Sequence, residues 1–586
     1  MVEVDAKSVA EEWLSAFASS LSPGNSSRIS PLFTPGGYFR DFLVFAWDCR
    51  TIHGASNIQD FVSTNLPELV HNFQLDTSSP HLSPVLDKSD PSIEMIKAFF
   101  IFETERALCR GAVSIIRTQG GGESPSWKAL SVFTAVADWK GYEEAPYLDV
   151  QNQNDVEDNR YEHKLQGRVV AESDPTVLIV GAGQSGLQLA ARLRQSGISC
   201  MLLEKEARVG DNWRKRYPSL KLHVPRVYCQ LLYQPYPSNY PEYIPKDLVA
   251  NWLEAYALAQ NLHVWNSSTL ESAPSYDPTT RTWTVSVIKD GRHHVLHPRH
   301  LVMALGPFGE GIIPEVKGRD IFEGSQTHSE HFPGGREYTG KRVLVFGAGN
   351  SASDICVDLV QKGAESVTLS QRSPTCVHSG KYIRILIKAF FPDNVPIDVT
   401  DFKMDTMPAK LMIESFRTQQ KIAREYDKEM LNGLEAAGLK LWDGPSGAGY
   451  IELGLTRGGG YFFDSGFASL VSDGTINLKT DVDITRFADK SVIFSDGSEL
   501  EVDAIVYATG YRPVRDTYKR ILGDKFVDET SEIWNLDEEG EVRGVYRPAG
   551  HPGFWYAAGD FSFSRRSSKR LALLIRAFEL GYYVPK

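Results

Sequence analysis

A glycine-rich stretch of the sequence, GAGQSG, has the residue types and the spacing that bind a dinucleotide. It places Gly181, Gly183 and Gly186 as G-x-G-x-x-G between a run that predicts a strand at 176–180 and one that predicts a helix at 187–195. The first glycine permits a tight turn, the second lets the backbone approach a pyrophosphate, and the third allows the helix to pack closely on the strand. The pyrophosphate would lie on the free N–H groups at the start of the helix, beside Gln184 and Ser185.

The acid that follows this unit indicates which dinucleotide it binds. A second predicted strand, at 199–203, ends at Glu204. A carboxylate there can accept hydrogen bonds from both ribose hydroxyls of the adenosine, and it repels a 2′-phosphate. We therefore expect FAD or NAD at this site rather than NADP. A lone G-x-G-x-x-G can be merely structural, but here the strand, helix, second strand and acid follow in order.

The strand–glycine–helix pattern returns in KRVLVFGAGNSASDIC. Gly347 and Gly349 keep the turn, Ala352 replaces the third glycine, and Asn350 and Ser351 stand between them. This second unit predicts a second dinucleotide site.

The second unit ends in a base instead of an acid. Its second predicted strand, at 366–370, is followed by Gln371 and Arg372. A guanidinium at this place can clamp a 2′-phosphate through charge-assisted hydrogen bonds, which predicts NADPH at the second site. The alternative for Arg372 is an ordinary solvated surface cation.

Two such sites, one for a tightly held flavin and one for a hydride donor, imply a flavoprotein redox enzyme. Two later apolar runs predict strands that return to the flavin domain, one ending at Thr509 and Gly510 and the other just before Asp560. A carboxylate at the carboxyl end of a strand can accept hydrogen bonds from the ribityl hydroxyls of the flavin. The N-cap of a helix is nearly as good an interpretation of Asp560.

The composition argues against several other classes of protein. The 586 residues carry a net charge of −12 without a block of Lys and Arg, and an acidic surface repels nucleic acid. The first residues lack the basic and apolar regions of a signal peptide, and there is no run of about 18 apolar residues that could span a membrane. The six cysteines are scattered without C-x-x-C spacing, so we expect neither a disulfide framework nor a metal site. We expect a soluble, cytoplasmic enzyme with a small-molecule substrate.

The chain divides into an α+β part and an α/β part. Residues 1–150 combine a predicted helix at 8–19 with later strand-rich runs, and the polar, aperiodic residues 151–172 are typical of a linker. From there on, apolar strands alternate with helices, which indicates an α/β fold with two Rossmann-type domains. We assign an FAD-binding domain to residues 173–334 and 501–586, and an NADPH-binding domain with a helical insertion to residues 335–500.

The amino-terminal 150 residues, with YFRDFLVFAWDCRTIHG, resemble the NTF2-like (SnoaL-like) cone fold. Cones of this kind often enclose a small-molecule pocket, and Asp41, Asp48, Arg50 and His53 could line one here. Alternate residues of a strand face opposite sides, so these four need not converge. A role in covering the flavin domain or in forming a homodimer is the stronger expectation.

Twin dinucleotide sites occur in disulfide reductases and in flavin monooxygenases. The reductases need a redox-active cysteine pair near the flavin, and the sequence has none. In FEGSQTHSEHFPGG, by contrast, Phe322, Gly324, His328 and Phe332 follow the order F-x-G-x-x-x-H-x-x-x-[FYW]. This stretch resembles the identifying motif of the flavin-containing (class B) monooxygenases and their Baeyer–Villiger relatives.

A second likeness follows Glu204, where GDNWRKRYPSLKLHVP resembles the flavin-binding segments of the YUCCA-type monooxygenases. Trp213 and His223 are among its matching positions, although Trp213 could equally be aromatic packing. Two departures count against Baeyer–Villiger chemistry. Those enzymes have Trp–Pro where this chain has Phe332–Pro333, and an aspartate near the position of His223.

The resemblance implies that NADPH reduces FAD and that O₂ then adds as a C4a-hydroperoxyflavin, which passes one oxygen atom to the substrate. N- or S-hydroxylation is the first expectation because a soft nucleophile needs little activation and no catalytic triad is visible. His328 and Arg372 would place NADP⁺ rather than act as acid and base. Baeyer–Villiger or YUCCA-type decarboxylative chemistry, and a non-catalytic or uncoupled flavoprotein, are the alternatives.

Overall fold

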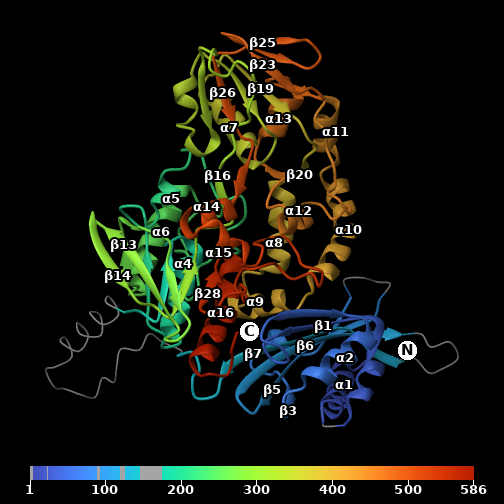
Figure 1. Cartoon of the computed structure of the whole chain (residues 1–586). Coiled ribbons are helices and arrows are strands. Elements are labelled where there is room, and N and C mark those ends of the chain that lie inside the picture. The colour runs from blue at the N-terminus through green and yellow to red at the C-terminus, as the bar shows by residue number, and fades with distance from the viewer. Residues whose placement is uncertain (1–3, 23, 89–92, 119–125, 146–173, 586) are drawn as a thin grey trace.

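The computed structural model describes residues 4–22, 24–88, 93–118, 126–145 and 174–585, so the predicted linker lies outside the described residues. These residues form three parts, each built on one large sheet (Figure 1). The amino-terminal part lies at the bottom of the view, the first parallel sheet beside and above it, and the second parallel sheet at the top.

The amino-terminal part is an α+β unit whose helices cover one face of a mixed sheet. Its strands run in the order β2-β1-β7-β6-β5-β3, and β1 pairs with β7 in parallel. The predicted helix is confirmed as α1 (Ala6–Ser20), and its Phe17 packs against Phe39 and Phe100 of the sheet. The likeness to the NTF2-like cone stays a prediction. The other elements are β1 (Phe33–Phe42), β2 (Cys49–His53), α2 (Ala55–Asn65), β3 (Val70–Leu75), β4 (Val85–Asp87), β5 (Met95–Thr104), β6 (Ala107–Thr118) and β7 (Ser126–Trp139).

The first parallel sheet has the strand order β10-β9-β8-β15-β28. Its central strands are short, apolar and fully buried, as expected for a sheet covered on both faces. The helix after the first glycine motif, α4 (Gln184–Gln195), packs against the carboxyl-terminal helix α16 (Phe561–Glu579). The strands are β8 (Val177–Val180), β9 (Cys200–Leu203), β10 (Val264–Trp265), β15 (His300–Met303) and β28 (Phe554–Tyr556).

The second parallel sheet has the order β17-β26-β18-β19-β22, and it corrects the predicted domain boundaries. Both β17 (Ser325–His328) and β26 (Ala504–Tyr507) fall in the ranges predicted for the flavin domain, but β26 lies between β17 and β18 (Arg342–Phe346) in the second sheet. A short buried apolar run does not reveal which of two parallel sheets it will join, because both sheets offer the same surroundings. The return to the first sheet is made by β28. The remaining elements of the second sheet are α7 (Asn350–Gln361), β19 (Ser366–Gln371) and β22 (Ile476–Thr480).

The predicted helical insertion is confirmed between β19 and β22. Its helices form the right-hand side of the molecule in Figure 1 and extend from the second sheet down to the amino-terminal part. They are α8 (Gly380–Phe390), α9 (Ile397–Asp405), α10 (Ala409–Tyr426), α11 (Lys428–Ala436) and α12 (Tyr450–Thr456).

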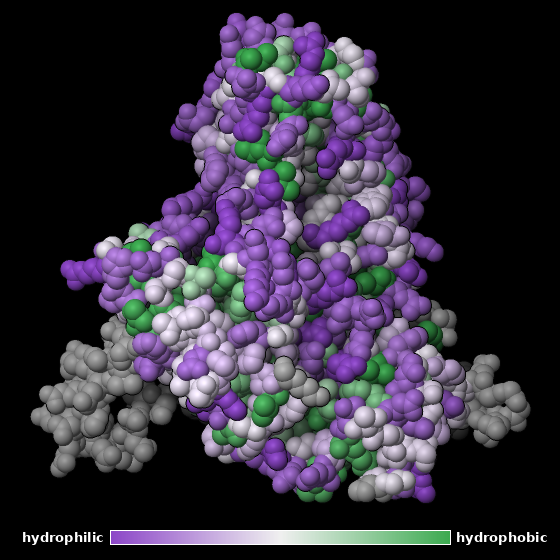
Figure 2. Space-filling view, viewed as in Figure 1, coloured by the Kyte–Doolittle hydropathy of each residue, from purple (hydrophilic) through white to green (hydrophobic). Residues whose placement is uncertain are grey.

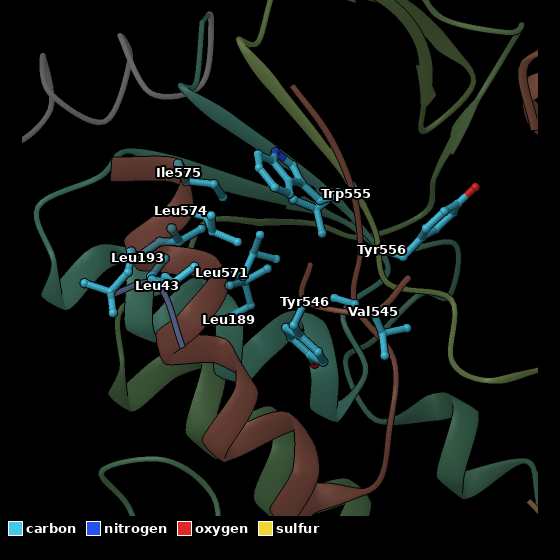
Figure 3. Close-up of a cluster of buried hydrophobic side chains, with 14 of the residues drawn as sticks. Leu43, Leu189, Leu193, Val545, Tyr546, Trp555, Tyr556, Leu571, Leu574 and Ile575 are labelled. Atoms are coloured by element: carbon cyan, nitrogen blue, oxygen red, sulfur yellow. The ribbon is translucent and has the colours of Figure 1, made fainter. Parts of the chain in front are cut away.

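The amino-terminal part docks firmly on the rest of the chain. Leu43, directly after β1, lies in the same buried cluster as Leu193 of α4 and Leu571 of α16 (Figure 3). Its φ of +70° is uncommon for a residue with a side chain, and burial of the leucine offsets that strain. The indole N–H of Trp139 donates to the Leu573 carbonyl at 2.9 Å.

The four polar residues that could have lined a pocket in this part face different neighbours. Asp41 is buried and accepts a hydrogen bond from the Thr134 hydroxyl at 2.7 Å, and His53 packs on the ring of Tyr38. Asp48 and Arg50 instead form ion pairs with Arg547 and Glu539 of the carboxyl-terminal region. Asp48 and Arg50 therefore hold the docking interface, and a pocket lined by this set stays a prediction.

The face in Figure 2 is largely hydrophilic, with hydrophobic residues in small groups. Within the described ranges, no helix combines the length and the apolar character needed to cross a membrane.

Candidate active site between two dinucleotide cradles

The first glycine motif forms a cradle, Gly181 to Gly186, between the carboxyl end of β8 and the start of α4. Gly181 has φ of +110°, in the region that favours glycine. A Cβ at Gly186 would lie 2.0 Å from the Gly181 carbonyl oxygen, so the turn is closed by backbone contact. At Gly183 the nearest atom to an added Cβ would be 3.6 Å away, an ordinary contact, so the backbone there is not crowded. This cradle fits a pyrophosphate.

The side chains between these glycines have structural partners. The Gln184 amide donates to the Gly559 carbonyl at 3.2 Å, and the Ser185 hydroxyl lies 2.8 Å from that of Ser564. Both contacts tie the start of α4 to the start of α16. These two residues can therefore offer a ligand their backbone N–H groups, and their part in binding the pyrophosphate stays a prediction.

Glu204 lies at the carboxyl end of β9, where the ribose of a dinucleotide is expected. Its carboxylate accepts hydrogen bonds from the N–H groups of Ala182 at 2.9 Å and Glu206 at 3.0 Å. Burial raises its pKa. Each carboxylate oxygen keeps a further lone pair, so the group can still accept ribose hydroxyls.

Buried polar atoms without a protein partner lie in the neighbouring segment. They include the indole N–H of Trp213, whose ring packs 5.8 Å from that of Phe561, and the Nε–H of Arg216. Buried donors normally have a hydrogen-bond partner. Because these two have none among the described residues, they can donate to a bound group. Together with the open backbone at Gly183, they fit FAD in the first cradle.

Asp560 has the role of a helix N-cap. It accepts a hydrogen bond from the Phe563 N–H at 2.8 Å and another from the Tyr228 hydroxyl at 2.8 Å. The residue is nevertheless exposed at the carboxyl end of the first sheet. Its contact with the ribityl chain stays a prediction.

The second cradle, Gly347 to Ala352, repeats this geometry at the start of α7. Gly347 has φ of +124°, and a Cβ there would lie 2.2 Å from the Ala508 carbonyl oxygen. Gly349 faces open space, since the nearest atom to an added Cβ is 4.0 Å away. The Asn350 side chain accepts a hydrogen bond from the Phe463 N–H at 3.0 Å, and Ser351 follows it in the first turn of α7. The open backbone fits a second pyrophosphate.

Arg372 directly follows β19 and is exposed. The neighbouring Gln371 is occupied, because its amide binds both the N–H and the carbonyl of Lys440. Arg372 forms no ion pair with any residue that the structure describes, so its charge is available to a 2′-phosphate. Its position fits NADPH in the second cradle.

A hydrogen-bonded bridge joins α7, the helix of the second cradle, through Asp354 to the segment of residues 217–223. One carboxylate oxygen of Asp354 accepts from the Tyr217 hydroxyl at 2.8 Å and lies 2.8 Å from Nε2 of His223. Sequence reasoning missed Asp354. Its signal was its place four residues after Asn350, which puts both residues on one face of the helix that starts the second cradle. His223, predicted to bind a cofactor, has this carboxylate as its partner.

His328 and Thr509 hold the backbone segments in which the chain passes between the two parallel sheets. Nδ1 of His328 accepts the Glu330 N–H at 3.2 Å, and Nε2 lies 3.1 Å from the Gly510 carbonyl and therefore carries the proton. Burial lowers the pKa of this imidazole. Both ring nitrogens are hydrogen-bonded to the backbone, and the role of His328 in placing NADP⁺ stays a prediction. The Thr509 hydroxyl likewise donates to the Ile312 carbonyl.

Comparison with known proteins finds relatives of this chain. Residues 178–394 match the family described as pyridine nucleotide-disulphide oxidoreductase. A probable indole-3-pyruvate monooxygenase of Arabidopsis thaliana, YUCCA9, is 31% identical over 57% of this chain and 74% of its own length. The indole-3-pyruvate monooxygenase YUCCA8 of Oryza sativa subsp. indica is 31% identical over 60% of this chain and 79% of its length.

Solved structures share the fold. Cyclohexanone monooxygenase with bound ε-caprolactone superimposes with a TM-score of 0.51 at 17% identity, over 70% of this chain and 89% of that one. The monooxygenase OTEMO in complex with FAD and NADP gives a TM-score of 0.50 at 18% identity, over 70% of this chain and 84% of that one. These likenesses support two Rossmann-type domains.

Proposed function

The chain belongs to the class B flavin-dependent monooxygenases, which use FAD and NADPH, and from this premise we propose that it inserts one oxygen atom of O₂ into a small organic substrate at nitrogen or sulfur. The observation that carries the proposal is the pair of cradles, one followed by the buried acid Glu204 and the other by the exposed base Arg372. An acid excludes a 2′-phosphate and a guanidinium attracts one, so the two cradles have different ligands.

Bound FAD, once reduced by NADPH, supplies the activation of O₂. The residues of the chain bind the two cofactors, orient them and shield them from solvent. The backbone at Gly183 and Gly349 holds the two pyrophosphates, Glu204 selects the flavin nucleotide, and Arg372 selects the phosphorylated hydride donor. The bridge of Asp354 to Tyr217 and His223 keeps the second cradle against the flavin segment.

Oxygenation at nitrogen or sulfur is favoured because the described site has few side chains free to act as a general acid or base. Both nitrogens of His328 are engaged with the backbone, and Nε2 of His223 is engaged with Asp354. A soft nucleophile needs least help from an acid or a base, so it suits such a site best.

A second candidate is decarboxylative oxygenation of a 2-oxo acid. Two relatives are named as indole-3-pyruvate monooxygenases. A 2-oxo acid needs a cation for its carboxylate, and Arg216 is a cation in the segment beside the first cradle. The names of these relatives favour the second candidate.

The test is product identification with purified, FAD-loaded protein, NADPH and O₂. N,N-dimethylaniline, thioanisole, cyclohexanone and indole-3-pyruvate represent the four substrate chemistries. An N-oxide or a sulfoxide formed in step with NADPH consumption supports the first proposal, and indole-3-acetate supports the second. Hydrogen peroxide without an oxygenated product from any probe would refute both.

A further inference from the structure

We propose that the amino-terminal part is a positioning device for the flavin site, acting through α9 on the end of α16 that carries Asp560. The inference rests on the proposed function, because it concerns the same flavin site. The matched family range begins at residue 178, and the amino-terminal part lies before it. Figure 1 shows α9 directly above the sheet of that part and beside α16.

The sheet of the amino-terminal part holds one face of α9 by apolar and aromatic contacts. Phe402 of α9 lies in a buried cluster with strand residues of that sheet, 5.7 Å from the ring of Phe99 and 6.0 Å from that of Phe133. The Arg110 guanidinium stacks over Phe402, 3.3 Å from the ring centre. Stacked cations and aromatic pairs fix orientation as well as contact area.

Arg40 holds the end of α9. Its guanidinium donates to the carbonyls of Asp405 at 2.6 Å and Met407 at 3.0 Å, and it forms a two-point ion pair with Glu541 at 2.6 and 2.8 Å. Glu541 also accepts the Thr51 hydroxyl at 2.6 Å. The helix end is therefore fixed to the sheet and, through the same guanidinium, to the carboxyl-terminal region.

A different side of α9 holds α16. Asp401 forms a two-point ion pair with Arg565 at 2.6 and 2.7 Å, and Asp405, one turn later, pairs with Arg566. Asp401 and Phe402 are adjacent in sequence, so they leave the helix on different sides. Movement of Phe402 against the sheet would therefore move Asp401 and, through its ion pair, Arg565.

Arg565 in turn fixes the segment that shapes the flavin site. Its guanidinium donates to the carbonyls of Tyr228 at 3.2 Å and of Gln230. The Tyr228 hydroxyl donates to Asp560 at 2.8 Å. Arg565 is 1% exposed, and a buried cation that loses its carboxylate is strongly unfavourable. The chain of contacts thus runs from Phe402 through Arg565 and Tyr228 to Asp560, which is exposed at the start of α16.

The experiment compares full-length variants loaded with FAD. Phe402→Ala removes the apolar contacts between the sheet and α9, and Asp401→Asn weakens the ion pair between α9 and Arg565. The double variant combines both changes. Arg50→Ala is the matched control, because Arg50 also joins the amino-terminal part to the carboxyl-terminal region but pairs with Glu539 instead of α9. Should Phe402→Ala fail to fold, Arg110→Met weakens the same contact and leaves the ring in place.

Three readouts report on the flavin site itself. They are the Kd of FAD, the quenching of flavin fluorescence by iodide, and the peroxide made without substrate, in which NADPH, one proton and O₂ give NADP⁺ and H₂O₂. We expect Phe402→Ala and Asp401→Asn each to raise all three by about 2- to 30-fold, the range for changes in coupling between sites. The double variant should be no worse than the worse single variant, because both break one chain of contacts.

Two results would overturn the proposal. One is that Phe402→Ala or Arg110→Met behaves like wild type and Arg50→Ala. The other is that Asp401→Asn alone changes the readouts, which would leave α9 important and the amino-terminal part without this role. If the wild type binds FAD but oxygenates no probe, the proposed function fails while iodide quenching and the Kd of FAD still decide the inference.

Discussion

Gly183 and Gly186 lie in one cradle, but an added methyl group would meet very different surroundings at the two positions. At Gly183 the new Cβ would lie 3.6 Å from Nδ2 of Asn212, an ordinary contact. At Gly186 it would lie 2.0 Å from the Gly181 carbonyl oxygen and 3.2 Å from its carbon. A backbone carbonyl cannot swing away like a flexible side chain, so the turn itself must shift, and overpacking of this kind costs about 1–3 kcal/mol.

The two alanine variants should therefore fail for different reasons. Gly183→Ala should leave the apoprotein as stable as wild type, but its methyl group occupies the space through which the pyrophosphate reaches the backbone. Each lost hydrogen bond to a charged group is worth about 1.5–3 kcal/mol, or a rise of about 10- to 150-fold in the Kd of FAD. Gly186→Ala should lower the stability of the apoprotein as well.

The assay separates the two effects. Flavin is stripped, the unfolding temperature of each apoprotein is measured by calorimetry, and FAD is titrated back while its fluorescence is followed. Gly459→Ala serves as the control, because no atom lies within 4 Å of its added Cβ. The reasoning is refuted if Gly183→Ala binds FAD like wild type, or if its apoprotein is as destabilised as that of Gly186→Ala.

Three further predictions concern the second cradle, the bridge and the docking interface. Arg372→Ala should raise the KM for NADPH about 10- to 150-fold, the loss of one charge-assisted contact, and leave that for NADH unchanged; an equal rise with NADH would contradict a 2′-phosphate role. Asp354→Ala should lower the free energy of unfolding by about 1–3 kcal/mol because two donors lose their acceptor, and Asp354→Asn by less; equal stability of all three proteins in urea titration would argue against the bridge. Burial acts to raise the pKa of Glu541, but Arg40 and hydrogen bonds outweigh it and lower the pKa from 4.5 to about 2. The ionised Glu541 therefore contributes its full stabilisation to the folded protein above pH 4.5, and this stabilisation is lost as the pH falls towards 2. That loss amounts to about 3 kcal/mol, and acid unfolding of Glu541→Gln should lack it.

The strand–glycine–helix units could be predicted because each is decided within a few residues. The turn at Gly181, the start of α4 and the acid at Glu204 all follow from the order of residue types, and the structure has them in that order. Helix α1 was predictable for the same reason, since the spacing of its apolar residues fixes one buried face.

The partners of polar side chains could not be predicted in this way. Asp354 reaches His223 across 131 residues of sequence, and Arg40 reaches Glu541 across 501. Nothing near either residue in the sequence indicates its partner, because an ion pair depends on which surfaces meet after folding. The sheet of β26 was wrongly assigned for a related reason, since its buried apolar residues suit either parallel sheet.

The sequence by itself determined the two dinucleotide cradles and the difference in charge between them, because both are local consequences of glycine conformation and strand length. The tertiary structure decided how the cradles are joined, through Asp354, and where the amino-terminal part docks, through Leu43 and α9. Those contacts unite surfaces that are remote along the chain, so their energy belongs to the fold as a whole and to no single stretch of residues.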